Sequence, residues 1–156
     1  MRGEKRAKRT RWAAGVATEG LILDGDAGAV RGGLSELFAR PLLARLTEDS
    51  RGTVEIVLAE VLNNIAEHAY AAFPGTIEIS VSAHDGFLFV RLIDSGLPMP
   101  GGELPGGTLS RATEIQDLPE GGFGWFLIRS LTQELTYLRE GDQNRLSFCV
   151  DVEYVD

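Results

Sequence analysis

The sequence has few of the residues from which disulfides and metal sites are built. Its 156 residues include one cysteine, Cys149, and two histidines. A single cysteine cannot form an internal disulfide, and with two separated histidines it cannot complete a structural zinc site. Cys149 lies in the alternating run RLSFCVDV, which predicts a strand position rather than a nucleophile or a metal ligand. The lack of disulfides favours a cytoplasmic protein.

Long apolar runs are also missing. No stretch approaches the roughly 18 apolar residues of a membrane-spanning helix. The first twelve residues lack the apolar segment of a signal peptide. We therefore expect no membrane partner. An apolar content of 44% in a chain of single-domain length is sufficient for one hydrophobic core.

Positive charge is scarce outside the N-terminus. The formal net charge is −8, but the first twelve residues carry +5, which leaves −13 on the remainder. An acidic fold argues against nucleic acid as a direct partner, because phosphate binding requires a basic surface on the fold itself. Residues 1–16 are predicted to form a basic, disordered arm, and residues 17–156 a single folded domain.

The spacing of apolar residues predicts an α+β fold. The expected order of elements is strand, two helices, two strands, helix and two strands. This order predicts a two-layer α/β sandwich, in which helices cover one face of a mostly antiparallel sheet. The expected strands are 17–23, 77–81, 87–93, 136–139 and 145–152. The expected helices are 27–46, about 50–72 and 122–133. The first helix is expected to be interrupted near Pro41, and the second to have Asp49 or Ser50 as its N-cap.

The helix around Ala59–Tyr70 organises the sequence. Helical spacing places Glu60, Asn64 and His68 on one face. The other face is apolar and is expected to pack on the core. A row of an acid, an amide and an imidazole suits a binding or catalytic site, although the same residues would also suit a solvated helix face.

A second candidate site lies at the end of the predicted hairpin. Asp94 ends its second strand, where a carboxylate can accept a hydrogen bond from an exocyclic amine. Gly96 would allow a ligand to approach the backbone. Asp-Ser-Gly is also ordinary turn chemistry, so this motif alone does not decide between the two interpretations.

The following segment is rich in proline and glycine. Residues 97–120 contain four of the six prolines and form either a lid over a ligand or a plain surface loop. Gly101–Thr108 has the glycine spacing of a P-loop, but Gly107 stands at the lysine position, which excludes that motif. Gly122-Phe123-Gly124 then opens a helix, where free backbone N–H groups favour phosphate.

Together these motifs resemble a known family. An E-x-x-x-N-x-x-x-H helix, a D-x-G strand end, a proline- and glycine-rich lid and a G-x-G helix start occur in this order in the GHKL ATP-binding superfamily. The chain is most similar to its anti-sigma-factor serine/threonine-protein kinases, over about residues 17–152. The resemblance implies the Bergerat-type ATP-binding fold.

The resemblance also implies a role for each motif residue in binding ATP and Mg²⁺. Two departures bear on these roles: Pro98 stands where relatives often carry glycine, and Glu120-Gly121 where some carry a basic residue. The implied roles are general base for Glu60, magnesium ligand for Asn64, an orienting role for His68, adenine recognition for Asp94 with Gly96, and phosphate binding for Gly122, Phe123 and Gly124.

The implied activity is phosphorylation of a STAS-type anti-sigma-factor antagonist on Ser or Thr in a partner-switching system. The same protein would bind and inhibit a sigma factor, and a homodimer is expected. One alternative is a nucleotide-gated protein-binding module of the same fold without kinase activity. Another is an ATPase that hydrolyses ATP without a protein acceptor.

Overall fold

The computed structural model describes residues 18–106 and 122–156. The predicted basic arm and residues 107–120 of the predicted lid lie outside these described residues. The elements in chain order are β1 (Thr18–Asp24), α2 (Ala27–Phe38), α3 (Pro41–Ala44), α4 (Glu48–Asn64), the π-helix η1 (Ile65–Ala69), β2 (Thr76–His84), β3 (Phe87–Asp94), the 3₁₀-helix η2 (Pro100–Gly102), α5 (Gly122–Leu131), β4 (Gln133–Glu140) and β5 (Gln143–Asp151).

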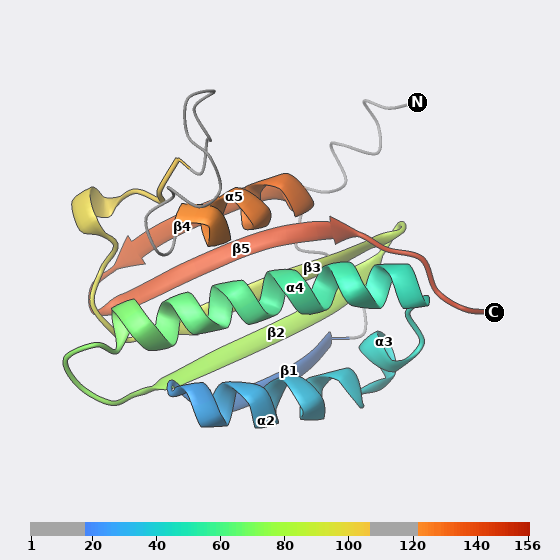
Figure 1. The fold of residues 1–156 in the computed structure, drawn as a ribbon, viewed down its shortest axis with the longest axis horizontal. Coiled ribbons are helices and arrows are strands. Elements are labelled where there is room, and N and C mark those ends of the chain that lie inside the picture. Colours follow the sequence, from blue (N-terminus) through green and yellow to red (C-terminus); the bar gives the residue numbers. More distant parts are fainter. Residues whose placement is uncertain (1–17, 107–121) are drawn as a thin grey trace.

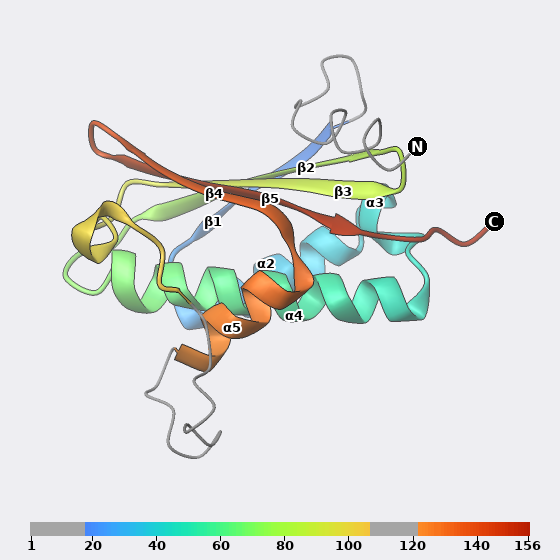
Figure 2. The same cartoon turned by 90° about the horizontal axis from the view of Figure 1, so that it is seen from above.

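The described strands form one sheet in the order β1-β2-β3-β5-β4, and every neighbouring pair is antiparallel (Figure 1). The helices α2, α4 and α5 lie on one face of this sheet (Figure 2). The predicted two-layer α+β sandwich is therefore confirmed.

The core lies between this helix layer and the sheet. The residues of β2 and β3 that face the helices alternate along each strand and are at most 1% exposed: Ile77, Ile79, Val81, Leu88, Val90 and Leu92. Helix α4 and the following π-helix η1 contribute a continuous apolar face: Leu58, Leu62, Ile65 and Ala69 are all buried, as predicted. The β2–β3 turn consists of Asp85 and Gly86, both with positive φ, which matches the right-handed twist of a tight hairpin.

The start of α4 differs from the prediction. Thr47 is the N-cap, and its hydroxyl accepts a hydrogen bond from the Ser50 backbone N–H at 3.3 Å. Asp49, one of the two predicted caps, lies in the first turn instead, where its charge complements the helix dipole. Ser50, the other, is buried, and its hydroxyl accepts from the Glu153 backbone N–H at 2.8 Å. That bond ties the helix start to the C-terminal segment.

The end of this helix also differs from the prediction. The α-helix gives way to a π-helical turn over Ile65–Ala69, and helical structure stops there rather than near residue 72. Tyr70 follows, and its backbone N–H donates to the Ile65 carbonyl, five residues earlier, at 3.1 Å. A π-turn inserted in a helix is frequent at functional sites.

The last hairpin is tighter than predicted. Its turn contains only Gly141 and Asp142, not the five residues 140–144, and Gly141 has a φ of 57°. As a result Asn144 belongs to β5, where it pairs with Asp94 of β3. In the described part of the chain, no helix is long and apolar enough to cross a membrane.

Candidate functional site

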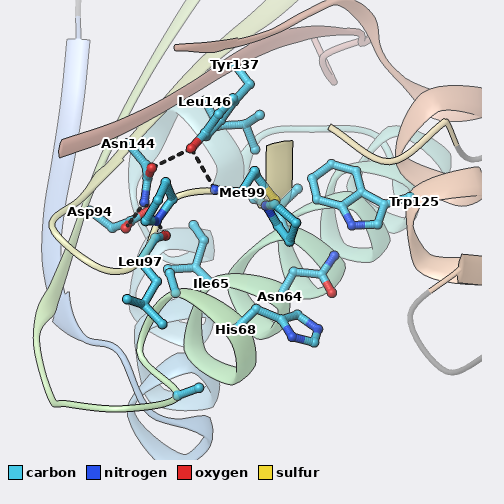
Figure 3. Close-up of a pocket in the computed structure, with 15 residues that line it drawn as sticks. Asn64, Ile65, His68, Asp94, Leu97, Met99, Trp125, Tyr137, Asn144 and Leu146 are labelled. Carbon is cyan, nitrogen blue, oxygen red and sulfur yellow. Dashed lines mark hydrogen bonds between the residues drawn. The ribbon is translucent and has the colours of Figure 1, made fainter. Parts of the chain in front are cut away.

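A cavity of about 250 Å³ opens beside the C-terminal half of the long helix, between that helix and the ends of β3 and β5 (Figure 3). Apolar side chains form most of its wall, and Asp94, Asn64, His68 and Asn144 supply the polar groups. The lining residues are Val61, Asn64, Ile65, His68, Ala69, Ala71, Asp94, Leu97, Pro98, Met99, Pro100, Trp125, Tyr137, Asn144 and Leu146.

Asp94 lies at one end of this cavity and is only 5% exposed. Its Oδ1 accepts two hydrogen bonds, from the Gly96 backbone N–H at 2.9 Å and from Asn144 Nδ2 at 2.7 Å. Among residues 18–106 and 122–156, no group donates to Oδ2. The protein therefore fixes the carboxyl group through one oxygen and leaves the other available to a ligand that carries a donor.

Asn144 was not predicted as a site residue, yet it connects three elements. Its Nδ2 also donates to the Leu97 carbonyl at 2.9 Å, and its Oδ1 accepts from the Tyr137 hydroxyl and from Arg139 Nη1. The Tyr137 hydroxyl in turn accepts from the Met99 backbone N–H at 2.9 Å. This network fixes the first residues of the predicted lid against β4 and β5 (Figure 3).

The environment changes the acidity of Asp94. Burial raises the pKa of its carboxyl group above the usual value, while the hydrogen bonds from Asn144 and Gly96 and the charge of Arg139 act in the opposite direction. The fold thus favours the protonated carboxyl group. The carboxyl group of Asp94 contributes most to the free energy of unfolding at a pH below its unfolded-state pKa. That contribution is lost as the pH rises through the raised folded-state pKa.

Within residues 18–106 and 122–156, Asn64 is a buried polar side chain with an unsatisfied hydrogen-bonding group. It is 7% exposed, and its Nδ2 is buried without a hydrogen-bond partner in the described part of the chain. An unpaired buried amide costs roughly 1–3 kcal/mol. Asn64 lines the cavity together with His68, so a ligand there can supply the missing partner.

Glu60 lies one helical turn before Asn64 and is half-buried. The first turn of α5 approaches it closely: a Cβ atom at Gly124 would lie 2.6 Å from Glu60 Oε2 and 3.9 Å from Asn64 Nδ2. A side chain at position 124 would require the carboxylate of Glu60 to move away, so glycine allows the present close approach. The free N–H groups at the start of α5 thus lie beside the acid and the amide.

Gly96 permits a second close approach, at the other end of the cavity. A Cβ atom there would lie 2.4 Å from the Ala69 carbonyl oxygen. That carbonyl accepts from the Leu97 backbone N–H at 2.7 Å, which joins the start of the predicted lid to the end of the π-helix. Gly96 thus serves packing as well as the predicted approach of a ligand.

The predicted site residues fall into two groups. Asp94, Asn64 and His68 line one cavity, with Gly96 at its edge, and His68 is exposed at its mouth. Glu60 and Gly124 lie together beside Asn64. Gly122 and Phe123 begin α5, in the same first turn as Gly124. Arg129 of the same helix donates to the Pro105 carbonyl at 2.9 Å.

Tyr70 is a further residue that the sequence did not single out. Its hydroxyl donates to the Thr76 carbonyl at 2.6 Å and accepts from the Ser95 backbone N–H at 2.8 Å. Burial raises the pKa of this hydroxyl, so it stays protonated as the donor that the first bond requires. Tyr70 therefore fixes the segment that follows Asp94.

This arrangement suits a flat, mostly apolar ligand that carries one donor and a charged tail. The cavity is slightly smaller than the roughly 300–1,000 Å³ of pockets that enclose a drug-sized ligand. It therefore suits a planar base, with Asp94 Oδ2 as its polar partner. An anionic tail that left the cavity past Asn64 would reach Glu60 and the N-terminus of α5, where a metal ion or free N–H groups can neutralise it.

Comparisons with known proteins found a matching family model and several similar proteins. Residues 23–150 match a family model described as the histidine kinase-like ATPase domain. The chain is 31% identical over 91 residues to a serine-protein kinase RsbW of Halalkalibacterium halodurans, over 57% of this chain and 56% of that protein. It is 26% identical over 89 residues to the RsbW of Bacillus cereus, over 56% of each protein. The match thus spans about half the length of these relatives.

A solved structure shares the fold. The RsbU and RsbW domains of a Mycobacterium tuberculosis protein superpose with a TM-score of 0.57 at 14% identity. The superposition covers 87% of this chain and 32% of that one. At this identity the likeness concerns the arrangement of helices and strands.

Proposed function

Since the chain belongs to the histidine kinase-like ATPase family, we propose that it is an ATP- and Mg²⁺-dependent protein serine/threonine kinase. Its substrate would be a STAS-type anti-sigma-factor antagonist, and it would also bind a sigma factor as an anti-sigma factor. The similarity to serine-protein kinases named RsbW supports the kinase assignment.

The observation that carries this proposal is the polar pattern of the cavity. At one end a buried carboxylate keeps one oxygen available. At the other end, a buried amide that has no hydrogen-bond partner among the described residues lies beside a half-buried glutamate and the start of a helix. Adenine has an exocyclic amine for the first position, and a magnesium-bound triphosphate fits the second. The residues present therefore fit Mg·ATP.

The roles of the individual residues follow from this fit. Asp94 Oδ2 would accept a hydrogen bond from the adenine amine, and Ile65, Met99 and Leu146 would enclose the base. Asn64 would hold Mg²⁺ through Oδ1, which leaves its Nδ2 to donate to a phosphate oxygen. The N–H groups of Gly122, Phe123 and Gly124 would bind phosphate, and His68 would orient the site from its mouth.

Glu60 would act as the general base. It would accept the proton of the acceptor hydroxyl as that oxygen attacks the γ-phosphorus, and the leaving group is ADP. Bound magnesium supplies neutralisation of the charge on the phosphates. The position of Glu60 beside Asn64 and the start of α5 supports this role.

Phosphorylation would weaken the complex with the antagonist. A phosphoserine carries a charge of about −1.5 to −2 at pH 7. Outside its N-terminal arm this chain carries −13, so the modified antagonist would meet a surface of the same sign. The released kinase would then be able to bind a sigma factor, which is the step expected of a partner switch.

The experiment that tests this function measures transfer of the γ-phosphate from labelled Mg·ATP to the STAS-domain proteins of the source organism. We expect label on one antagonist, no label when EDTA removes Mg²⁺, and no label when the acceptor Ser or Thr is replaced by Ala. ATP binding without labelling of any STAS protein would instead support a nucleotide-gated binding module.

A magnesium role for Asn64 predicts a specific change in Asn64→Ala. In the wild type we expect Mg²⁺ to tighten ATP binding by roughly tenfold or more, and in the variant this gain should disappear. Titration calorimetry with and without Mg²⁺ measures it. Asn63→Ala is the matched control, because Asn63 is exposed on the same helix and should leave the gain unchanged. A full magnesium effect in Asn64→Ala would exclude the role.

The raised pKa of Asp94 predicts a pH dependence of ATP binding. Only the ionised carboxylate leaves Oδ2 as a pure acceptor, so affinity should be full above the raised pKa and should fall as the pH drops through it. Binding would release a proton in that range, and calorimetry in buffers of different ionisation enthalpy detects it. An affinity that rose on acidification would contradict the assigned role.

A further inference from the structure

A continuous chain of hydrogen bonds joins the Met99 backbone to the carboxyl group of Asp94 (Figure 3). The Met99 N–H donates to the Tyr137 hydroxyl at 2.9 Å. That hydroxyl donates its own hydrogen to Asn144 Oδ1, and Asn144 Nδ2 donates to Asp94 Oδ1 at 2.7 Å. The first residues of the predicted lid are therefore connected to the carboxylate that lies at the end of the cavity.

Each bond in this chain can run in only one direction. A backbone N–H can only donate, so the Tyr137 oxygen accepts from Met99 and has its single hydrogen left for Asn144. The amide of Asn144 is fixed in the same sense, because its Nδ2 also donates to the Leu97 carbonyl, which can only accept. Asn144 therefore always presents its NH₂ group to Asp94.

Asn144 lines the cavity, but its hydrogen-bonding groups are already occupied. An asparagine side chain can donate two hydrogen bonds and accept two, and Asn144 makes all four while only 4% exposed. The fourth comes from Arg139 Nη1 at 3.2 Å, and the same nitrogen donates to the Gly96 carbonyl at 2.7 Å. The network can therefore act on a bound base through Asp94 Oδ2, not through the amide of Asn144.

We propose that Tyr137 is a positioning residue for base selection, which couples the orientation of Asp94 to that of the Leu97–Met99 segment. In the proposed function, on which this inference rests, Asp94 Oδ2 accepts from the adenine amine. Leu97 and Met99 line the same cavity, so one network holds both the carboxylate that recognises the base and the segment that encloses it. A base that cannot bond to Asp94 gains nothing from the Tyr137 hydroxyl.

The groups around Asp94 determine what loss of this hydroxyl would do. Burial raises the pKa of Asp94, whereas the hydrogen bond from Asn144 and the charge of Arg139 lower it. Tyr70 is the other titratable group near this carboxyl group, and His68 lies on the same cavity. Without the Tyr137 hydroxyl, Arg139 would still hold Asn144 Oδ1, so Asp94 would keep its place with one support fewer.

Tyr137→Phe removes the hydroxyl and keeps the ring in the cavity wall. We expect affinity for Mg·ATP to fall by about three- to tenfold, the effect of one neutral hydrogen bond, and affinity for Mg·GTP to stay within about twofold. In an Asp94→Asn background the same change should alter ATP affinity by less than about twofold. Titration calorimetry measures all four proteins. Tyr154→Phe is the matched control, since its hydroxyl donates to the Leu42 carbonyl, away from the cavity.

Selective loss of ATP affinity that requires Asp94 would establish the role of Tyr137. Equal losses for ATP and GTP, or an undiminished loss in the Asp94→Asn background, would show that the hydroxyl only supports the cavity wall and would overturn the proposal. An effect of the same size in Tyr154→Phe would also overturn it, because loss of any tyrosine hydroxyl would then be sufficient.

A second measurement needs no nucleotide. Protonation of Asp94 weakens its acceptor oxygen, so the NMR signal of the Met99 backbone amide should follow the titration of Asp94. This response should vanish in Tyr137→Phe and in Asp94→Asn, whereas a response that came from His68 would persist in Asp94→Asn. If the wild type bound no nucleotide, the proposed function would fail, and the coupling would stand only on this response. A Met99 response that is unchanged in Tyr137→Phe would overturn the coupling itself.

Discussion

Glu60→Gln is expected to abolish phosphoryl transfer and to leave ATP binding nearly intact. The amide has the size of the carboxylate but cannot accept the proton of the acceptor hydroxyl. General-base catalysis contributes roughly 10²–10⁴-fold to a rate, so transfer should fall by at least that range. Glu60 is half-buried beside Gly124, outside the cavity that would hold the base, so the Kd for ATP should change by less than about threefold.

The measurement is single-turnover transfer of labelled phosphate to the antagonist, with the Kd for ATP taken from calorimetry. Glu55→Gln is the matched control, since Glu55 lies exposed on the same helix. A wild-type rate of phosphate transfer in Glu60→Gln would contradict the role of Glu60 as the general base. Loss of both transfer and ATP binding would mean that Glu60 holds the nucleotide rather than activates the hydroxyl.

Asp94→Asn should lose ATP affinity by about 100-fold without loss of stability. Its amide oxygen can still accept from Gly96 and Asn144, as Oδ1 does now. The new NH₂ group would then face the adenine amine, so that two donors meet. A lost hydrogen bond to a charged group costs roughly 1.5–3 kcal/mol. Because burial raises the pKa of Asp94, removal of its charge should not lower the melting temperature at pH 7.

Thermal shift with ATP and with GTP measures this change, since a bound ligand stabilises the folded protein by an amount that grows with the logarithm of its concentration relative to its Kd. Guanine presents an acceptor where adenine presents its amine, so the preference of Asp94→Asn should move toward GTP. Asp24→Asn, a change of an exposed strand-end aspartate, is the control. An unchanged ATP shift in Asp94→Asn would contradict adenine recognition by Asp94.

Much of this site could be predicted from the sequence because its residues are close together along the chain. Helical spacing placed Asn64 and His68 on one face, and the structure puts both on one cavity. Strand alternation placed Asp94 at a strand end, where it is found. The family prediction is confirmed by the match over residues 23–150. The chemical roles of these residues stay predictions.

The network behind Asp94 was missed for a topological reason. Asn144 was assigned to a five-residue turn, whereas the structure has a two-residue turn, Gly141-Asp142, and pairs Asn144 with Asp94. Two-residue hairpin turns that contain glycine are common, so Gly141 could have indicated the short turn in the sequence. The pairing of β3 with β5 joins residues 50 positions apart, which local periodicity does not reveal.

The end of the long helix was mispredicted because tertiary contacts determine it. Ala69 accepts from the Leu97 N–H, and Tyr70 bonds to Thr76 and Ser95. These bonds draw the chain out of helical geometry several residues before Pro74, the breaker visible in the sequence.

The most direct test of the account is calorimetric titration of the full-length protein with Mg·ATP and with Mg·GTP at neutral pH. The account predicts one saturable ATP site per chain and a GTP affinity lower by about 100-fold, the value of one hydrogen bond to Asp94. Equal affinities for the two nucleotides would show that Asp94 does not select the base. No binding of either nucleotide would contradict the proposed function as a whole.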